Sequence, residues 1–147
     1  MSFTGSGPTG ITIKVNNLEE RLLISKLYEA SNAGVPIRLL VRSVCCLVAG
    51  VAGQSENITL KRVVGRYLEH GRIFIFRNND CPDVFLGSAD WMNRNIYRRI
   101  EVCFPIEDAS FQDEIIELMN LQFAAGSEDS QREVYKYLSE KQSTLNE

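Results

Sequence analysis

His70 is the single histidine of the chain, and Arg66 and Arg72 flank it closely in sequence. Imidazole is the side chain that titrates near neutral pH without help from its surroundings, so it can accept a proton or meet a phosphoryl group. We therefore predict a catalytic role for His70, with Arg72 as a supporting cation by position and Arg66 as a weaker one. A solitary histidine is also common in structural and surface positions, and the sequence leaves such a role open.

Arg42 ends an apolar run that covers residues 37–41, and a segment that contains Gly50 and Gly53 follows it. A charge at the end of a buried strand must reach solvent, a carboxylate or a phosphate, because burying it alone is costly. The guanidinium group matches phosphate oxygens bidentately. Two partners are open for Arg42: a bound phosphate, or a structural ion pair with a residue such as Glu56.

The tetrapeptide Gly87-Ser88-Ala89-Asp90 is a third feature that could meet an anion. Small residues at the end of a predicted strand let backbone N–H groups approach a negatively charged ligand. Asn93 follows within the next turn of the chain. We predict that Ser88 and Asn93 line the same pocket as Arg42 and His70.

Other kinds of chemistry find little support in the sequence. It contains no Walker A, GxGxxG or GxSxG pattern, which disfavours a P-loop site, a dinucleotide site and a Ser-His-Asp hydrolase. The cysteines include no CxxC pair, so zinc is not expected, and without a secretion signal they should be reduced thiols in a cytoplasmic protein. They are Cys45, Cys46, Cys81 and Cys103. No acidic cluster offers a magnesium cage, so we predict no metal ligand here. A participating magnesium ion would bind mostly to substrate phosphates or to another chain segment.

The elements that must position these residues follow an α/β pattern. Hydrophobic periodicity predicts a strand over 11–15, a helix over 17–33 that opens on a capping box, and a strand over 37–41. This order predicts parallel pairing with a right-handed crossover. Ligands bind such sheets beyond the carboxyl ends of the strands, which is where Arg42 lies. Further strands are predicted over 59–67, 72–77, 84–86 and 99–104, and helices over 91–94 (capped by Asp90), 108–124 and 130–141.

The composition is that of one globular domain, with 147 residues of which 44% are apolar and 24% charged. No apolar run approaches the roughly 20 residues of a membrane span. The net charge of −3 is unevenly spread, because residues 36–99 are basic on balance and residues 100–147 are acidic. The basic middle would attract an anion, although solvated acidic faces on the last helices explain the same split. Residues 1–10 are predicted to be a linker or a remnant of cloning, and residues 11–147 the domain.

Four strings, in order, resemble the C-terminal part of bacterial polyphosphate kinases, the histidine-phosphorylated family that builds polyphosphate from ATP. They are IKVNNLEE, AGVPIRLLVRSVCCL, GQSENITLKRVVGRYLEHGRIFIF and LGSADWMNRNIYRRIEVCFPI. The resemblance implies an α/β fold of the phospholipase D type, with a mixed, mainly parallel sheet flanked by helices. It identifies residues 11–147 as the second phospholipase D-like domain of such a kinase.

The resemblance also implies a function and a set of partners. The family transfers the γ-phosphoryl group of ATP reversibly to inorganic polyphosphate with magnesium. Arg42 and His70 match family residues that contact the ATP phosphates or the transferring phosphoryl group. The implied partners are ATP, ADP, polyphosphate, the remaining domains of the same polypeptide and, in the full-length enzyme, further copies in a homo-oligomer, with no nucleic acid. The implied location is cytoplasmic, with peripheral attachment to the inner membrane as an alternative. The phosphorylated histidine belongs to another domain, so this chain alone is expected to be inactive.

Two other functions stay open. The same segment resembles, more distantly, one half of a phospholipase D-type domain, whose pattern pairs HxK-x4-D with a following GSxN. Here Arg72 replaces Lys, Arg77 replaces Asp and Asp90 replaces Asn, which disfavours phosphodiester hydrolysis. The second alternative is a stand-alone module that binds a nucleotide or a polyanion without chemistry.

Overall fold

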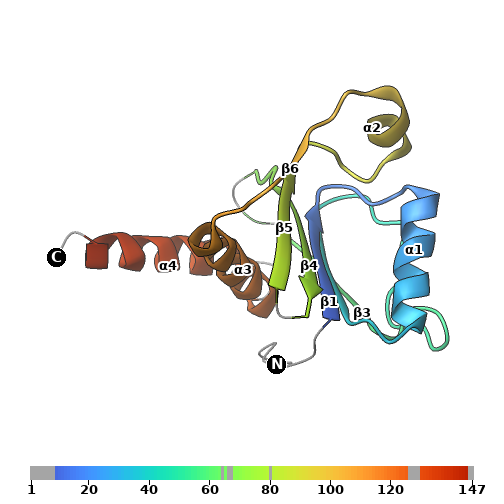
Figure 1. Ribbon diagram of the computed structural model, residues 1–147, viewed down its shortest axis with the longest axis horizontal. Helices are drawn as coiled ribbons and strands as arrows, with labels where there is room; N and C mark the ends of the chain where they lie inside the picture. The colour runs from blue at the N-terminus through green and yellow to red at the C-terminus, as the bar shows by residue number, and fades with distance from the viewer. Residues whose placement is uncertain (1–8, 64, 66–67, 80, 126–129, 146–147) are drawn as a thin grey trace.

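A six-stranded sheet with the strand order β3-β2-β1-β4-β5-β6 organises the chain (Figure 1). The computed structural model describes residues 9–63, 65, 68–79, 81–125 and 130–145. The strands are β1 (Thr9–Val15), β2 (Ile37–Val41), β3 (Ile58–Arg62), β4 (Arg72–Asn78), β5 (Cys81–Gly87) and β6 (Cys103–Pro105). The helices are α1 (Arg21–Asn32), α2 (Asn93–Arg98), α3 (Ala109–Ala124) and α4 (Ser130–Leu145).

The sheet has a parallel half and an antiparallel half. β1, β2 and β3 run parallel, whereas β4 pairs antiparallel with β1, β5 with β4, and β6 with β5. The α/β class and the mixed sheet flanked by helices are confirmed, but the expected predominance of parallel pairing is corrected. A turn at Asn79, which has a φ of 48° that asparagine tolerates, leads from β4 into β5. A connection this short can join only antiparallel neighbours, since parallel strands need a crossover.

Helices cover both faces of the sheet (Figure 1). Helix α1 packs on one face over a core that includes Ile13, Val15 and Leu39. Helix α3 packs on the other face over Leu40 and Ile75, and α4 contacts α3. Alternate residues of one strand point to opposite faces, so β2, whose five residues are all buried, supplies both cores.

Helix α1 begins later than the sequence predicts. Residues 16–19 stay outside the helix because Leu18 forms bridges to Cys45 and to Trp91 on two neighbouring segments. The N-cap is therefore Glu20, whose carboxylate accepts a hydrogen bond from the backbone N–H of Leu23 at 2.7 Å. Tertiary pairing overrides the capping box that the local sequence favours.

Other boundaries move by a few residues. β1 begins at Thr9, so Thr9 and Gly10 belong to the sheet and not to the predicted linker, whose residues 1–8 lie outside the described ranges. β6 is confined to Cys103–Pro105, and α2 begins at Asn93 with Met92 at its N-cap position. Asp90 does not cap α2, because other donors occupy its carboxylate. Within the described part of the chain, none of the helices has both the length and the apolarity needed to cross a membrane.

Candidate functional site

A cavity of about 320 Å³ lies where β1 and β2 end and β4 begins. Asn16 directly follows β1, Arg42 directly follows β2, and Arg72 is the first residue of β4. Because β4 runs antiparallel to β1, its first residue meets the carboxyl ends of the parallel strands at one edge of the sheet. The lining residues are mostly polar or charged: Asn16, Asn17, Arg42, Ser43, His70, Arg72, Asp90, Arg94, Asn95 and Arg99.

The structure brings together three of the six residues that the sequence predicts for the site. Arg42, His70 and Arg72 all line this cavity. Neither Ser88 nor Asn93 is among its lining residues. Arg66 lies outside the described residues.

Ser88 has a structural role at the end of β5. Its hydroxyl donates to the Glu101 carboxylate and accepts the backbone N–H of Val102 at 3.0 Å. These bonds tie the end of β5 to the segment that leads into β6. The small residues around Ser88 therefore serve a strand connection in this structure.

Arg42 reaches into the cavity and donates to the backbone carbonyl of Glu69 at 3.3 Å. Among the described ion pairs, none joins Arg42 to Glu56, the structural partner that the sequence left open. A carbonyl oxygen fixes the direction of the guanidinium group but does not neutralise its charge. Arg42 therefore retains a positive charge that faces the cavity.

Asn16 fixes the imidazole of His70 at its Nδ1 atom, 3.1 Å from the Asn16 amide. The Asn16 amide forms hydrogen bonds with all of its neighbours in one orientation. Its oxygen then accepts from His70 Nδ1 and Arg72 Nη2, and its nitrogen donates to the Glu69 carbonyl. This orientation suits the tautomer with its proton on Nδ1, in which Nε2 keeps the lone pair, and Arg72 Nη1 lies 3.3 Å from the same Nδ1. None of the described residues forms a hydrogen bond with Nε2.

Asp90 holds Arg72 in place. Its buried carboxylate, 4% exposed, accepts from Arg72 Nε at 3.2 Å and Arg72 Nη2 at 3.3 Å. It also accepts from the side chain of Asn17 at 2.9 Å and from the backbone N–H of Asn16 at 2.9 Å. Burial alone would raise the pKa of Asp90, but the hydrogen bonds from Arg72, Asn17 and Asn16 outweigh it and place the pKa below its ordinary value. Asp90 is therefore ionised at neutral pH and positions Arg72.

A buried polar network anchors the residue that precedes His70. The Glu69 carboxylate accepts from Lys14 and from Gln122 Nε2, the latter at 3.0 Å, and Lys14 Nζ also donates to Gln122 Oε1 at 2.9 Å. Burial opposes ionisation of Glu69, yet the contacts with Lys14 and Gln122 lower its pKa overall. Through these bonds β1 and α3 hold the segment that carries the imidazole.

The charges around the cavity favour an anionic ligand. Four guanidinium groups, those of Arg42, Arg72, Arg94 and Arg99, line it together with a single carboxylate, Asp90. Cavities lined by one sign of charge concentrate ligands of the opposite sign. Within the described ranges, no group of three or more His, Cys, Asp or Glu side chains could hold a metal ion.

Sequence reasoning missed Asn16, Asn17 and Asp90 as parts of this arrangement. The two asparagines looked like helix-capping residues, and Asp90 like the cap of α2. Their positions offered one signal, because Asn16 directly follows a predicted strand just as Arg42 does. Polar residues that follow two neighbouring parallel strands meet at the same edge of the sheet.

Comparisons with known proteins agree with the resemblance seen in the sequence. The family described as polyphosphate kinase C-terminal domain 2 matches residues 4–146. The chain belongs to this family. A polyphosphate kinase of Vibrio vulnificus is 51% identical over 113 residues, covering 77% of the chain and 16% of the relative. One of Staphylococcus saprophyticus is 42% identical over 148 residues, covering 99% of the chain and 21% of the relative.

Two solved structures have folds similar to that of this polyphosphate kinase domain. The crystal structure of polyphosphate kinase from Porphyromonas gingivalis matches with a TM-score of 0.86 and 36% identity, over 92% of this chain and 24% of that one. NucT from Helicobacter pylori matches with a TM-score of 0.54 and 14% identity, over 75% of this chain and 76% of that one. The second likeness concerns the fold alone and agrees with the phospholipase D-like architecture that was predicted. The chain spans about a fifth or less of the length of the curated relatives described above.

Proposed function

We propose that this chain is the second C-terminal domain of a polyphosphate kinase and supplies phosphate contacts for reversible transfer of the ATP γ-phosphoryl group to polyphosphate. One observation carries the proposal: Arg42 and His70, 28 positions apart in sequence, line the same cationic cavity in a member of this family. In the transfer, the bond between the γ-phosphorus and the oxygen bridging to ADP breaks. A new bond forms between that phosphorus and an oxygen acceptor, and ADP leaves with the electron pair.

The roles of the side chains follow from their contacts. Phosphoryl transfer depends mainly on positioning and on stabilising negative charge. Arg42 clamps phosphate oxygens, since its charge faces the cavity, and Arg72 supports it from a direction that Asp90 fixes. His70 presents Nε2 to the transferring phosphoryl group, where its lone pair accepts a proton and the imidazolium that results offsets negative charge. Ser88 and Asn93 have no direct part in this proposal.

Magnesium does not fit the residues of this cavity well. Asp90 is the single carboxylate among the lining residues, and hydrogen bonds from Arg72, Asn17 and Asn16 occupy it. A hard cation of this kind prefers several oxygen ligands. We therefore place any magnesium ion on the phosphates of ATP or on another domain, and assign no step to it here.

The rest of the proposed context concerns the whole enzyme. ATP, ADP and polyphosphate are the small-molecule partners, and the remaining domains of the polypeptide complete the active site. The enzyme is proposed to be a cytoplasmic homo-oligomer. A phospholipase D-type phosphodiesterase is less well supported, because Arg72, Arg77 and Asp90 stand where that pattern has Lys, Asp and Asn.

Calorimetric titration of ATP and of short polyphosphate into this chain tests the proposal. Both should bind, and Arg42→Gln should weaken both by about tenfold, since a charge-assisted hydrogen bond contributes about 1.5–3 kcal/mol. The control is Arg132→Gln, an exposed arginine of α4 outside the cavity, which should bind both ligands normally. The isolated chain should make no polyphosphate.

Two results would count against the proposal. If the Arg42→Gln variant and the original chain bind ATP with equal affinity, the cavity does not contact the ATP phosphates through Arg42. Hydrolysis of bis-p-nitrophenyl phosphate by the purified chain would favour the phosphodiesterase alternative.

A further inference from the structure

Asn95 is a buried asparagine of α2 that lines the first cavity, the one that also contains Arg42 and His70. It is 4% exposed, and its side-chain amide nitrogen donates to Glu101 Oε1 at 2.8 Å. Within the described part of the chain, no group donates to its Oδ1 atom, which is shielded from solvent. Buried polar atoms nearly always have a hydrogen-bond partner, so an acceptor without one calls for an explanation.

Glu101 fixes which end of this amide is the acceptor. The Glu101 carboxylate also accepts from the Ser88 hydroxyl, and the hydrogen bonds from Ser88 and Asn95 lower its pKa, so it is ionised at neutral pH. An ionised carboxylate only accepts hydrogen bonds. It therefore requires the amide nitrogen of Asn95, because turning the amide over would set two oxygens against each other. The Asn95 oxygen is directed away from Glu101 and keeps its lone pairs for another donor.

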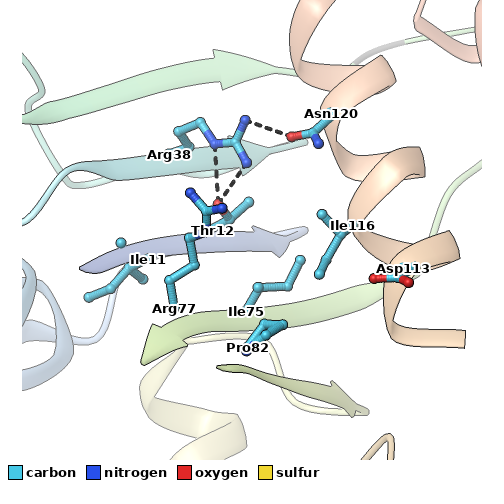
Figure 2. Close-up of a pocket in the computed structure, with 10 residues that line it drawn as sticks. Ile11, Thr12, Arg38, Ile75, Arg77, Pro82, Asp113, Ile116 and Asn120 are labelled. Carbon is cyan, nitrogen blue, oxygen red and sulfur yellow. Dashed lines mark hydrogen bonds between the residues drawn. The ribbon is translucent and has the colours of Figure 1, made fainter. Parts of the chain in front are cut away.

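An asparagine elsewhere in the chain shows the usual arrangement. Asn120 lines a second cavity, and its Oδ1 atom accepts from Arg38 Nη1 at 2.9 Å (Figure 2). Arg94 and Arg99 line the first cavity together with Asn95, yet none of the described hydrogen bonds runs from either of them to the Asn95 oxygen. This oxygen therefore differs from its surroundings, which present N–H donors to an anion.

We propose that Asn95 Oδ1 accepts a hydrogen bond from a ribose hydroxyl of ATP and so adds affinity that polyphosphate cannot gain. The contact rests on the function proposed above, in which ATP and polyphosphate are the ligands. The units within a polyphosphate chain carry neither N–H nor O–H groups, so they cannot donate to an amide oxygen. The nucleoside of ATP can, and its ribose is attached directly to the phosphates that Arg42 is proposed to hold. Arg94 and Arg99 are exposed side chains, which change rotamer readily and can uncover Oδ1 for the ligand.

Calorimetric titration of the chain with ATP, 2′-deoxy-ATP, 3′-deoxy-ATP and tripolyphosphate tests this contact. One of the two deoxy nucleotides should bind about fivefold more weakly than ATP, because it lacks the donor of a hydrogen bond between neutral groups. Asn95→Leu, which keeps the approximate size of the side chain but removes the acceptor, should weaken ATP binding by about fivefold and leave tripolyphosphate binding unchanged. In this variant the preference for the hydroxyl should disappear. Asn32→Leu, on an exposed asparagine at the end of α1, is the matched control and should bind all of these ligands like the original chain.

The results separate failure of this contact from failure of the proposed function. If neither ATP nor tripolyphosphate binds, the proposed function fails and the contact fails with it. If both bind and Arg42→Gln weakens both, but ATP and the two deoxy nucleotides have equal affinity, the ribose contact alone is wrong. Equal weakening of ATP and tripolyphosphate by Asn95→Leu would mean that Asn95 only shapes the cavity through Glu101, and would also overturn the contact. Because the deoxy nucleotides are compared on the original chain, that comparison decides the matter even if Asn95→Leu does not fold.

Discussion

Arginines in different parts of the molecule are held in different ways. At the ends of β1 and β2, Arg72 is paired with the buried carboxylate of Asp90, which balances part of its charge and fixes its direction. Within β2, Arg38 donates to the oxygens of Thr12 and Asn120. Arg42, which directly follows β2, donates to a backbone carbonyl. We therefore expect Arg42, beside a carbonyl oxygen, to make a stronger ligand contact than an arginine that a carboxylate already balances.

The strongest test of this distinction is the catalytic effect of the groups that face the first cavity. In the full-length kinase, Arg42→Ala or His70→Ala should lower kcat by about a hundredfold or more, since losing a preorganised charge contact to a transition state costs about 3 kcal/mol. Steady-state measurement of polyphosphate synthesis checks this. Arg132→Gln should keep normal rates. Near-normal turnover in either alanine variant would remove that residue from the site.

Asp90 should affect stability because its role is architectural. Asp90→Asn removes the charge that faces Arg72 and turns an amide N–H₂ toward donors, which should cost about 2 kcal/mol of the free energy of unfolding. Urea denaturation measures the change. Glu56→Gln, on an exposed carboxylate, should lie within about 0.5 kcal/mol of the original chain. If both variants unfold at the same urea concentration, Asp90 does not hold Arg72 as described.

The same pair predicts a loss of stability in acid. The pKa of Asp90 is lower in the folded chain than its ordinary value, so the pair stabilises the fold above the pKa of an unfolded aspartate, which is about 4. That contribution disappears as the pH falls through the lowered pKa. Urea midpoints measured from neutral pH down to acid should fall more steeply for the original chain than for Asp90→Asn. Parallel curves would contradict this assignment.

Part of the first cavity could be predicted from the sequence, because Arg42 and His70 lie next to predicted strands. Arg42 directly follows a buried apolar run, and His70 shortly precedes the run that forms β4. The carboxyl edge of a parallel pair is a general ligand site, so this placement was enough to bring the two residues together. The partnership of Asp90 with Arg72 could not be predicted, because it depends on a contact between residues far apart in the sequence.

The surroundings of Arg38 could not be predicted for a related reason. Arg38 lies inside β2, where one charge in an apolar run carries no sign of its surroundings. Its environment is created by α3, which follows it by about seventy residues and supplies Asn120. The sheet was likewise predicted only in its parallel half. Local periodicity identified β4 and β5, but the antiparallel direction of β4 against β1 depends on pairing between residues far apart in the sequence.

Thr12 gives a smaller effect, on stability and away from the candidate site. Thr12→Val keeps the shape of the side chain but removes the oxygen that accepts from Arg38, so we expect a loss of about 1–1.5 kcal/mol in the free energy of unfolding. ATP binding at the cavity of Arg42 and His70 should not change. Thr59→Val, at an exposed position of β3, is the matched control and should be nearly neutral. A clear loss of ATP affinity in Thr12→Val would show that the two regions are not independent.

The smallest effect on ATP binding is expected for a substitution of Arg99, which lines the cavity that contains Arg42 and His70. The side chain of Arg99 is 61% exposed, and its Nε lies 3.4 Å from Glu101 Oε1. Water therefore screens the guanidinium group, and the carboxylate balances part of its charge. Exposed pairs of this kind contribute about 1 kcal/mol or less. Arg99→Gln should therefore weaken ATP binding by about twofold at low salt and have no measurable effect at high salt, where screening is stronger. If Arg99→Gln lost as much ATP affinity as Arg42→Gln, and salt did not change that loss, an arginine beside a carboxylate could still contact the ligand. The contrast between Arg42 and the carboxylate-paired arginines would then be wrong.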